Sequence, residues 1–423
     1  MKNSARFQMV IEIIDQILDC SEIPCDRLLV NFFRQRRFMG SHDRRAITDY
    51  VYHILRIWPL LTFYRTPLNG RQAVLGFIRL TDSNFPITLK EIFQGEEYGP
   101  APLSTREQSE LAFKEGGPAP EWAQAWTPSW LWSYCQDSFG ERTFDEIQAL
   151  NQPVGFDVRI NSLRTDRSRV LKRFQQDQVM ATATPYSPLG IRLSHRQALQ
   201  NHFLFQEGYV EVQDEGSQLI ALLTDAQPGM TVLDLCAGAG GKTLALAASM
   251  QNKGVLLATD VYEWRLKKAK ERLKRAGIHN VECRLLGDSW LKRQKNRFER
   301  VLVDAPCSGT GTWRRNPDMK LRFQPSDLQD LLQKQQTILN TAADTVKPGG
   351  RLVYATCSML RVENHKQVDH FLTLHPDFHL LDIRDLWRKV LGTACPSDQP
   401  VLQLTPARHQ TDGFFISVLE KKV

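Results

Sequence analysis

Two cysteines lie directly after short apolar runs in the C-terminal half of the sequence. Cys307 stands in the stretch Asp304-Ala-Pro-Cys-Ser308, and Cys357 stands in Thr356-Cys-Ser358. Each apolar run predicts a buried parallel strand, and doubly wound folds carry reactive groups at the carboxyl ends of such strands. Because neighbouring parallel strands end at the same edge of a sheet, the two thiols are expected to meet there.

Two thiols and a nearby carboxylate suit the alkylation of a pyrimidine. Carbon 5 of the ring is a poor nucleophile, but a thiolate that adds to carbon 6 creates an enamine that is nucleophilic at carbon 5. A carboxyl group beside N3 would favour the addition by holding or supplying a proton, and Asp304 stands three residues before Cys307. We therefore expect a nucleophile and an assistant that act on one carbon centre.

A buried cysteine is often no more than a small apolar side chain. We prefer this interpretation for Cys20, Cys135, Cys236 and Cys283. The sequence contains no C-x-x-C pair, so neither zinc nor any other metal is expected, and the thiols are expected to be reduced.

A glycine-rich turn precedes both cysteines and is typical of cofactor binding. Asp234-Leu-Cys-Ala-Gly-Ala-Gly-Gly-Lys242 follows an apolar strand and opens a helix, and Asp260 closes the next predicted strand. Glycines allow a ligand close to the backbone, and the acidic residue is placed to hold ribose hydroxyls. Asp288, after the third strand, could reach an adenine edge. NAD is one alternative and a purely structural turn another, but the G-x-G-x-x-G pattern is absent, and S-adenosyl-methionine fits better.

These residues require a sheet to position them. From residue 216 onward the pattern alternates strand and helix, which predicts a mostly parallel sheet covered on both faces. Strands are expected at 231–235, 255–259, 281–285, 300–304, 350–355 and 413–419, with helices at 263–277 and 327–346 between some of them.

The remainder of the chain predicts different architectures. The N-terminal residues repeat apolar side chains at helical spacing, with a first helix near the start and a second at 43–58. Residues 95–120, rich in Gly, Pro, Glu and Ser, are expected to form a loop or linker, and a further helix runs from 128 to about 139. Strands near 156–160, 191–193 and 209–212 with a helix at 168–177 indicate a small α+β module.

Composition limits the class of protein. The chain has 423 residues, 42% hydrophobic and 24% charged, and a formal charge of +7, which favours an anionic partner. No apolar stretch has the length of a membrane span. Glu12, Asp15 and Asp19 interrupt any signal-peptide core, so we expect a cytoplasmic protein with no membrane partner.

At this point the motifs resemble those of the Fmu/Sun (NOP/Sun) family of RNA cytosine-C5 methyltransferases. The resemblance rests on Asp304–Gly311 with Arg314-Arg-Asn-Pro-Asp318, on Tyr354–Ser358 with Glu363-Asn364, and on Asp412-Gly-Phe-Phe415. Phe205-Gln-Glu-Gly208, Val212-Gln-Asp214 and Ser217-Gln218 are similar to the approach to the cofactor turn. The match begins near Pro153 and continues to the C-terminus.

The resemblance implies roles at the matching positions. Cys357 resembles the nucleophile, and Cys307 resembles the thiol that releases the product, with Asp304 as the third catalytic residue. The positions that contact S-adenosyl-methionine are matched by Cys236, Ala237, Gly238, Ala239, Gly240, Gly241, Lys242, Asp260, Asp288 and Asp304. One departure is Gly238-Ala239, where the family commonly has Ala-Pro, and this makes the turn more flexible.

The resemblance also implies an architecture and a substrate. We expect a helical NusB-like domain over 1–145, a small α+β (RRM-like) module over 146–215 and a seven-stranded Rossmann-like methyltransferase domain over 216–423. The N-terminus is similar to the RsmB-like bacterial subgroup, which implies 16S rRNA as the RNA partner and a monomeric enzyme. A tRNA substrate and a non-catalytic ribosome-assembly factor are the alternatives.

Basic residues offer possible RNA contacts. Arg34, Arg36 and Arg37 with Arg44 and Arg45 form a basic cluster around Gly40 that could bind phosphates, or that could be a solvated helix face. For Arg314 and Arg315 we favour RNA contact, because they follow the Cys307 loop directly. The lysine-rich helix at 263–277 is interpreted as the outer face of a helix that covers the sheet.

Overall fold

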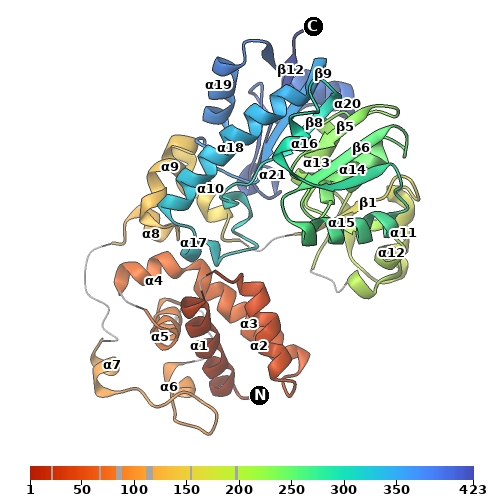
Figure 1. Ribbon diagram of the computed structural model, residues 1–423. Helices are drawn as coiled ribbons and strands as arrows, with labels where there is room; N and C mark the ends of the chain where they lie inside the picture. Colours follow the sequence, from red (N-terminus) through yellow and green to blue (C-terminus); the bar gives the residue numbers. More distant parts are fainter. Residues whose placement is uncertain (21, 66–67, 82–87, 111–117, 153–154, 196–198) are drawn as a thin grey trace. The chain divides into compact units, whose positions relative to one another are not determined.

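The computed structural model describes residues 1–423 except 21, 66–67, 82–87, 111–117, 153–154 and 196–198 (Figure 1). The side chains of 81, 109–110 and 288–289 are outside the description as well. The chain divides into two compact units. A helical unit comprises Met1–Gln152 and Trp313–Pro325, and a catalytic unit comprises Pro153–Thr312 and Ser326–Val423.

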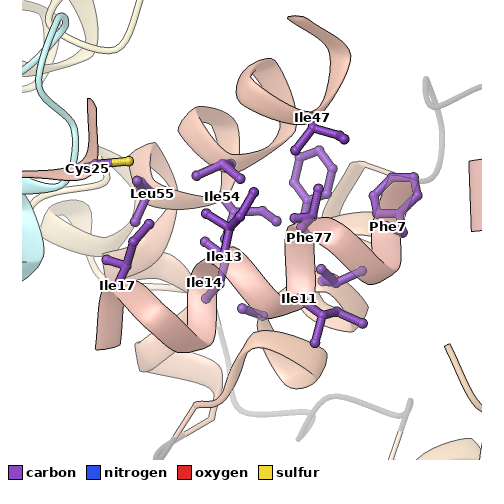
Figure 2. Close-up of a cluster of buried hydrophobic side chains, with 14 of the residues drawn as sticks. Phe7, Ile11, Ile13, Ile14, Ile17, Cys25, Ile47, Ile54, Leu55 and Phe77 are labelled. Atoms are coloured by element: carbon purple, nitrogen blue, oxygen red, sulfur yellow. The ribbon is translucent and has the colours of Figure 1, made fainter. Parts of the chain in front are cut away.

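The helical unit is built around an apolar core. Phe7, Ile14 and Ile17 of the first helix are almost completely buried against Ile47 and Leu55 of the third (Figure 2). Phe7, Ile14 and Ile17 are seven and three residues apart, which puts them on one helix face, so burial of that face drives the association. The helices of this unit are α1 (Asn3–Asp19), α2 (Cys25–Gln35), α3 (Ser41–Arg56), α4 (Trp58–Tyr64), α5 (Gly70–Thr81), α6 (Leu89–Ile92), α7 (Thr105–Glu110), α8 (Glu121–Gln124), α9 (Ser129–Phe139), η1 (Gly140–Arg142), α10 (Thr143–Ala149) and α17 (Met319–Arg322).

The segment Trp313–Pro325 belongs to the helical unit although it follows the Cys307 loop in sequence. The Asp318 carboxylate accepts a hydrogen bond from the backbone N–H of Cys25, and Phe323 packs its ring 5.6 Å from that of Trp130. The chain therefore leaves the catalytic unit after Thr312 and returns to it at Ser326.

A small α+β module begins the catalytic unit. Its antiparallel sheet has the order β2-β3-β1-β4, and one face packs Val158, Ile191 and Phe174 into an apolar core. The other face is polar yet buried, and it carries Asp157, Arg159 and Glu211. The elements are β1 (Phe156–Ile160), α11 (Arg167–Gln176), β2 (Ala181–Ala183), β3 (Gly190–Leu193), η2 (Leu199–Asn201), α12 (Phe203–Gln206) and β4 (Val210–Val212).

The main sheet of the catalytic unit has the strand order β10-β12-β9-β8-β5-β6-β7, and β11 pairs with β12. Strands β5 to β9 pair in parallel, whereas β12 is antiparallel to β9 and β10. The strands are β5 (Thr231–Asp234), β6 (Val255–Asp260), β7 (Val281–Leu285), β8 (Phe298–Asp304), β9 (Val346–Thr356), β10 (Phe378–Leu381), β11 (Leu402–Leu404) and β12 (Phe414–Lys421).

Helices cover both faces of this sheet. Alternate strand residues such as Val232 and Leu302 pack with α13, α14 and α20, and their neighbours Leu233 and Val301 pack with α18 and α19. The period of two along each strand produces these two separate apolar clusters. The helices are α13 (Glu215–Leu223), α14 (Gly241–Ser249), α15 (Glu263–Ala276), α16 (Asp288–Leu291), η3 (Thr310–Thr312), α18 (Pro325–Thr345), α19 (His365–Leu374), α20 (Ile383–Leu391) and α21 (Pro406–His409). No helix in the described ranges is both long and apolar enough to span a bilayer.

The structure confirms the predicted fold class: a mostly parallel, Rossmann-like sheet, a small α+β module and a helical N-terminal region. The NusB-like character and the domain limits at 145 and 215 stay predictions. Two predictions need correction. The helix expected second in the chain is the third, because α2 precedes it after the start signals Pro24 and Asp26. The expected linker contains α7, which Ser104 begins with a capping box to Glu107, while Gly116 and Gly117 lie outside the described residues.

Candidate active site

The two cysteine loops meet at the carboxyl ends of β8 and β9. These strands are parallel neighbours, and Asp304 at the end of β8 lies opposite Ala355 of β9. The Sγ atoms of Cys307 and Cys357 are 3.4 Å apart, and both side chains are partly exposed. Two thiols at this distance can reach adjacent atoms of a single substrate ring.

Glycines allow the backbones around these loops to approach each other closely. The N–H of Gly311 donates to the Cys357 carbonyl at 3.0 Å, and the N–H of Gly413 donates to the Gly311 carbonyl at 2.9 Å. A Cβ on Gly311 would lie 2.2 Å from the Gly413 carbonyl oxygen. A side chain at Gly311 would force the Cys307 loop away from Gly413, the residue before β12.

A partly buried ion pair lies beside the thiols. Nζ of Lys242 on α14 is 2.7 Å from an Asp304 carboxylate oxygen. Burial alone would lower the pKa of Lys242, but the charge and hydrogen bond of Asp304, with smaller contributions from Cys357 and Asp234, hold the pKa above its ordinary value. Lys242 is therefore a charged ammonium close to Cys357.

The glycine-rich turn connects β5 to α14. Gly238 and Gly240 have φ of +56° and +81°, which other residues adopt at a cost, and a Cβ on Gly238 would meet open space. Asp260 at the end of β6 is within reach of the turn, since its carboxylate accepts a 2.9 Å hydrogen bond from the N–H of Gly238. The turn thus has room on its open side and a carboxylate beside it.

Asp234, the last residue of β5, is a buried acid under the turn. Burial raises its pKa to about 7, and a hydrogen bond from the Thr243 hydroxyl opposes that shift. Its other carboxylate oxygen, Oδ1, is buried and has no hydrogen-bond partner among the described residues. An unsatisfied buried acceptor is uncommon and marks a place where a ligand donor would be favourable.

The small module supports the turn from behind. Arg159 of β1 donates to the Gly241 carbonyl at 2.9 Å, and Arg272 of α15 donates to the Ala239 carbonyl at 2.7 Å. Glu211 of β4 pairs with both Arg272 and Arg275. The polar face of the module's sheet is therefore used to hold the turn.

The pKa values of two thiols near the turn and the sheet edge, Cys307 and Cys236, are raised. The pKa of Cys307 is raised well above its ordinary value, first by its hydrogen bond with Cys357, then by burial and by the charges of Cys357 and Glu363. Burial raises the pKa of Cys236 as well, followed by the charges of Asp234 and Asp304. Both groups are therefore held as neutral thiols.

The structure brings most of the predicted site residues together. One point of the sheet edge is surrounded by Cys307, Cys357, Asp304 and Lys242. The turn from Cys236 to Gly241 and Asp260 lie beside it. The Asp288 side chain lies outside the described part. Arg314 is only 5% exposed, which corrects the expectation of RNA contact by this residue: the chain has entered the helical unit, where the Arg314 carbonyl accepts from Arg56. RNA contact by the half-buried Arg315 stays a prediction. The sequence reasoning did not find the contacts of Thr243 and Arg272, because they depend on elements distant in sequence.

Family comparisons agree with this geometry. A family described as 16S rRNA methyltransferase RsmB/F matches residues 221–420, and a family described as an RsmF/B-like ferredoxin-like domain matches residues 127–200.

Two named relatives and one solved structure are similar to the chain. The ribosomal RNA small subunit methyltransferase B of Pectobacterium atrosepticum is 31% identical over the full length of both chains. The probable ribosomal RNA small subunit methyltransferase B of Synechocystis is 34% identical over 70% of this chain, and the match spans just under two thirds (66%) of that relative. The crystal structure of PH0851 matches over the full length of both chains, with a TM-score of 0.80 and 25% identity.

Proposed function

Because the chain belongs to the RsmB/F family of 16S rRNA methyltransferases, we propose that it methylates carbon 5 of a cytosine in small-subunit ribosomal RNA through a covalent bond between Cys357 and carbon 6. The observation that carries the proposal is the 3.4 Å separation of the two sulfurs beside the Lys242–Asp304 pair. A base bonded to one sulfur would present its neighbouring carbon to the other.

The first step belongs to Cys357. Its sulfur adds to carbon 6, a C–S bond forms, and the π electrons of the ring move to carbon 5 and toward N3. We assign to Asp304 the holding or supply of the proton at N3, and Lys242 contacts this carboxylate at 2.7 Å. The ammonium of Lys242 is also close enough to Cys357 to favour the negative charge that this sulfur carries as a thiolate.

The last step needs a base and a leaving group. Removal of the proton at carbon 5 returns its electrons to the ring, and the bond to Cys357 breaks. Bonding of Cys357 to carbon 6 removes the hydrogen bond and the thiolate charge that raise the Cys307 pKa, so the partly exposed Cys307 can lose its proton to water. The resulting Cys307 thiolate, beside Cys357, then suits proton removal from carbon 5. This assigns Cys307 to product release.

The residues of the turn fit S-adenosyl-methionine. This cofactor, when bound, supplies an electrophilic methyl group. Residues Cys236 to Lys242 and Asp260 would hold it, with open space at Gly238, while the unpartnered Oδ1 of Asp234 offers an acceptor for a cofactor donor. A ligand without pyrophosphate is consistent with a turn that lacks the full dinucleotide pattern. Asp288 remains a proposed adenine contact on sequence grounds.

RNA contact by the helical unit is part of the proposal. Arg36 is paired with Glu12 and stacked on Phe32, so it is less available than the neighbouring arginines. The exposed positions are Arg34, Arg37 and Arg45, with Phe38 exposed at 76% between them. Arginines around an exposed ring suit phosphate contact and base stacking. The target base would have to leave its stack to reach Cys357. Cytoplasmic location and a monomeric state stay predictions.

The experiment that tests this function is bisulfite sequencing of total RNA from a strain that lacks the gene. We expect one protected cytosine of 16S rRNA to become unprotected, and a plasmid that carries the wild-type gene, but not Cys357→Ala, to restore it. Loss of a tRNA signal with an intact 16S pattern would favour a tRNA substrate. An unchanged pattern in both RNAs would contradict the proposal and favour a non-catalytic assembly factor.

A further inference from the structure

A fully buried carboxylate lies beneath both cysteine loops. Glu363 stands between β9 and α19 and has 0% exposure. Its Oε1 accepts the N–H of Ser308 at 2.8 Å and the side-chain amide of Gln335 at 3.0 Å. Its Oε2 accepts the hydroxyl of Ser308 at 2.5 Å and the hydroxyl of Ser358.

The two serines connect this carboxylate to the chemistry. Ser308 is the residue after Cys307, and Ser358 is the residue after Cys357. Their hydroxyl oxygens are 3.3 Å apart, so one carboxylate oxygen receives a hydrogen bond from each loop. The ladder between β8 and β9 ends at Asp304 and Ala355, before either cysteine. The relative position of the thiols therefore depends on contacts beyond the sheet.

Glu363 is itself held by the sheet. The Tyr354 hydroxyl on β9 donates to the Glu363 carbonyl at 2.6 Å. The adjacent Asn364 accepts from the Thr356 hydroxyl at 2.6 Å and donates to the Ser358 carbonyl at 2.9 Å. The carboxylate thus extends from a backbone that is hydrogen-bonded to β9.

Such an arrangement is specific rather than incidental. A buried carboxylate is strongly unfavourable unless donors replace its water, and here four donors from Ser308, Ser358 and Gln335 surround it. Gln335 on α18 also donates to the Pro306 carbonyl at 3.0 Å, which adds a third element to the same network. A purely apolar filling of this space would leave the N–H of Ser308 without its carboxylate acceptor.

We infer that Glu363 is a positioning residue that holds the Cys307 and Cys357 loops in register and sets the separation of the two sulfurs. Its use in catalysis rests on the proposed function, whereas the sulfur separation does not. Two thiols held at 3.4 Å have a high effective concentration for each other, and loops freed from a common acceptor have a lower one.

The test measures that effective concentration directly in the full-length protein without RNA. Oxidised glutathione converts the two thiols to one disulfide and is itself reduced to two molecules of glutathione. The ratio of disulfide to dithiol for Cys307 and Cys357 is read by peptide mapping across glutathione buffers. Wild-type protein should form this disulfide, and Glu363→Gln and Glu363→Ala should lower the effective concentration at least tenfold.

Glu215→Gln is the matched control. Glu215 is also fully buried and accepts two backbone N–H groups, from Tyr186 and Ser187, but it touches neither cysteine loop. This variant should keep the wild-type ratio. If a Glu363 variant fails to fold, the Ser308→Ala/Ser358→Ala pair, which leaves the carboxylate in place, should still lower the ratio.

Activity separates positioning from a structural role. When formation of the methylated RNA product is measured, Glu363→Gln should lower kcat and leave the KM for S-adenosyl-methionine unchanged. Glu363→Asp should recover part of kcat. An unchanged disulfide ratio in folded Glu363 variants would overturn the inference. If the wild-type protein methylates no cytosine, the proposed function fails, but the glutathione measurement still decides whether Glu363 positions the thiols.

Discussion

Two buried lysines, one in each unit of the molecule, have opposite electrostatic states. Lys242 in the catalytic unit and Lys320 in the helical unit are 9% and 5% exposed. Lys242 faces the Asp304 carboxylate, and its pKa is raised. Among the residues that the structure describes, Lys320 donates only to neutral oxygens, the carbonyls of Arg56 and Trp126 and the side chain of Asn151.

Burial, followed by the charge of Arg56, lowers the pKa of Lys320 to about 7. The two lysines differ in their partners, since burial acts on both in the same direction. A buried lysine beside a carboxylate keeps a permanent charge that chemistry can use. One held by carbonyls anchors a segment, here Trp313–Pro325, and becomes neutral near physiological pH.

The largest expected effect compares the lysines by activity. Lys242→Met removes the cation beside Asp304 and Cys357, and we expect kcat to fall about a thousandfold, roughly 4 kcal/mol in the barrier. Lys320→Met removes no charge from the sheet edge and should keep kcat within a few-fold. Transfer of labelled methyl groups to 16S rRNA measures both, with circular dichroism to confirm folding. Equal losses in the two variants would break the comparison.

The second prediction concerns the stability of the helical unit. The folded pKa of Lys320, about 7, is below its ordinary value of 10.5, so between these values the unfolded chain binds more protons and stability rises with pH. At about 1.4 kcal/mol per pKa unit, the gain between about pH 7 and 9 is about 2 kcal/mol. Hydrogen exchange of α3 and α17, corrected for the intrinsic exchange rate, measures it. Lys320→Met should abolish the slope, and a slope that persists would place its source elsewhere.

The third prediction concerns the stability of the catalytic unit, which should change with pH in the opposite direction. The folded pKa of Asp234, about 7, is above its ordinary 3.8, so the folded state binds more protons between these values and stability falls as pH rises. We expect a loss of about 2 kcal/mol between about pH 5 and 7. Asp234→Asn, which keeps the acceptor for Thr243, should remove this loss in hydrogen exchange of β5. A wild-type unit that gains stability over that range would contradict the account.

The smallest effect concerns the cofactor turn. Arg272 holds the Ala239 carbonyl, so Arg272→Gln should weaken binding of S-adenosyl-methionine about tenfold, or about 1.4 kcal/mol, by calorimetry. Arg275→Gln is the control, because Arg275 pairs with the same Glu211 but its contacts lie at Glu211 and Phe205. Ala239→Pro, added to the Arg272→Gln variant, should recover part of the lost affinity because proline stiffens the turn. Equal losses for both arginine variants would indicate a general effect of the Glu211 cluster.

The sheet and its reactive edge were predictable because their signals are local. The apolar runs before Asp304 and Cys357 and the glycines of the cofactor turn are contiguous in sequence, and parallel strands end at one edge by geometry. The resemblance to a family added the order of the roles of Cys357 and Cys307. The antiparallel strand β10 and the short edge strand β2, of four and three residues, were not predicted.

The supporting contacts were not predictable from the sequence alone. Glu363 meets Ser308 across 55 residues, and Arg159 meets Gly241 across 82. No local pattern encodes such pairs. Arg314 looked like an RNA contact because it follows the Cys307 loop, but the fold buries it in the helical unit. Proximity in sequence was misleading there because the chain changes units between Thr312 and Trp313.

The most direct test of the central claim is the capture of the bond between Cys357 and its RNA. Cys307→Ala protein, incubated with 16S rRNA and S-adenosyl-methionine, should accumulate a protein–RNA adduct that survives denaturing electrophoresis, because addition proceeds and release does not. The Cys307→Ala/Cys357→Ala protein should form none. An adduct in the double variant, or full turnover by Cys357→Ala alone, would contradict the account.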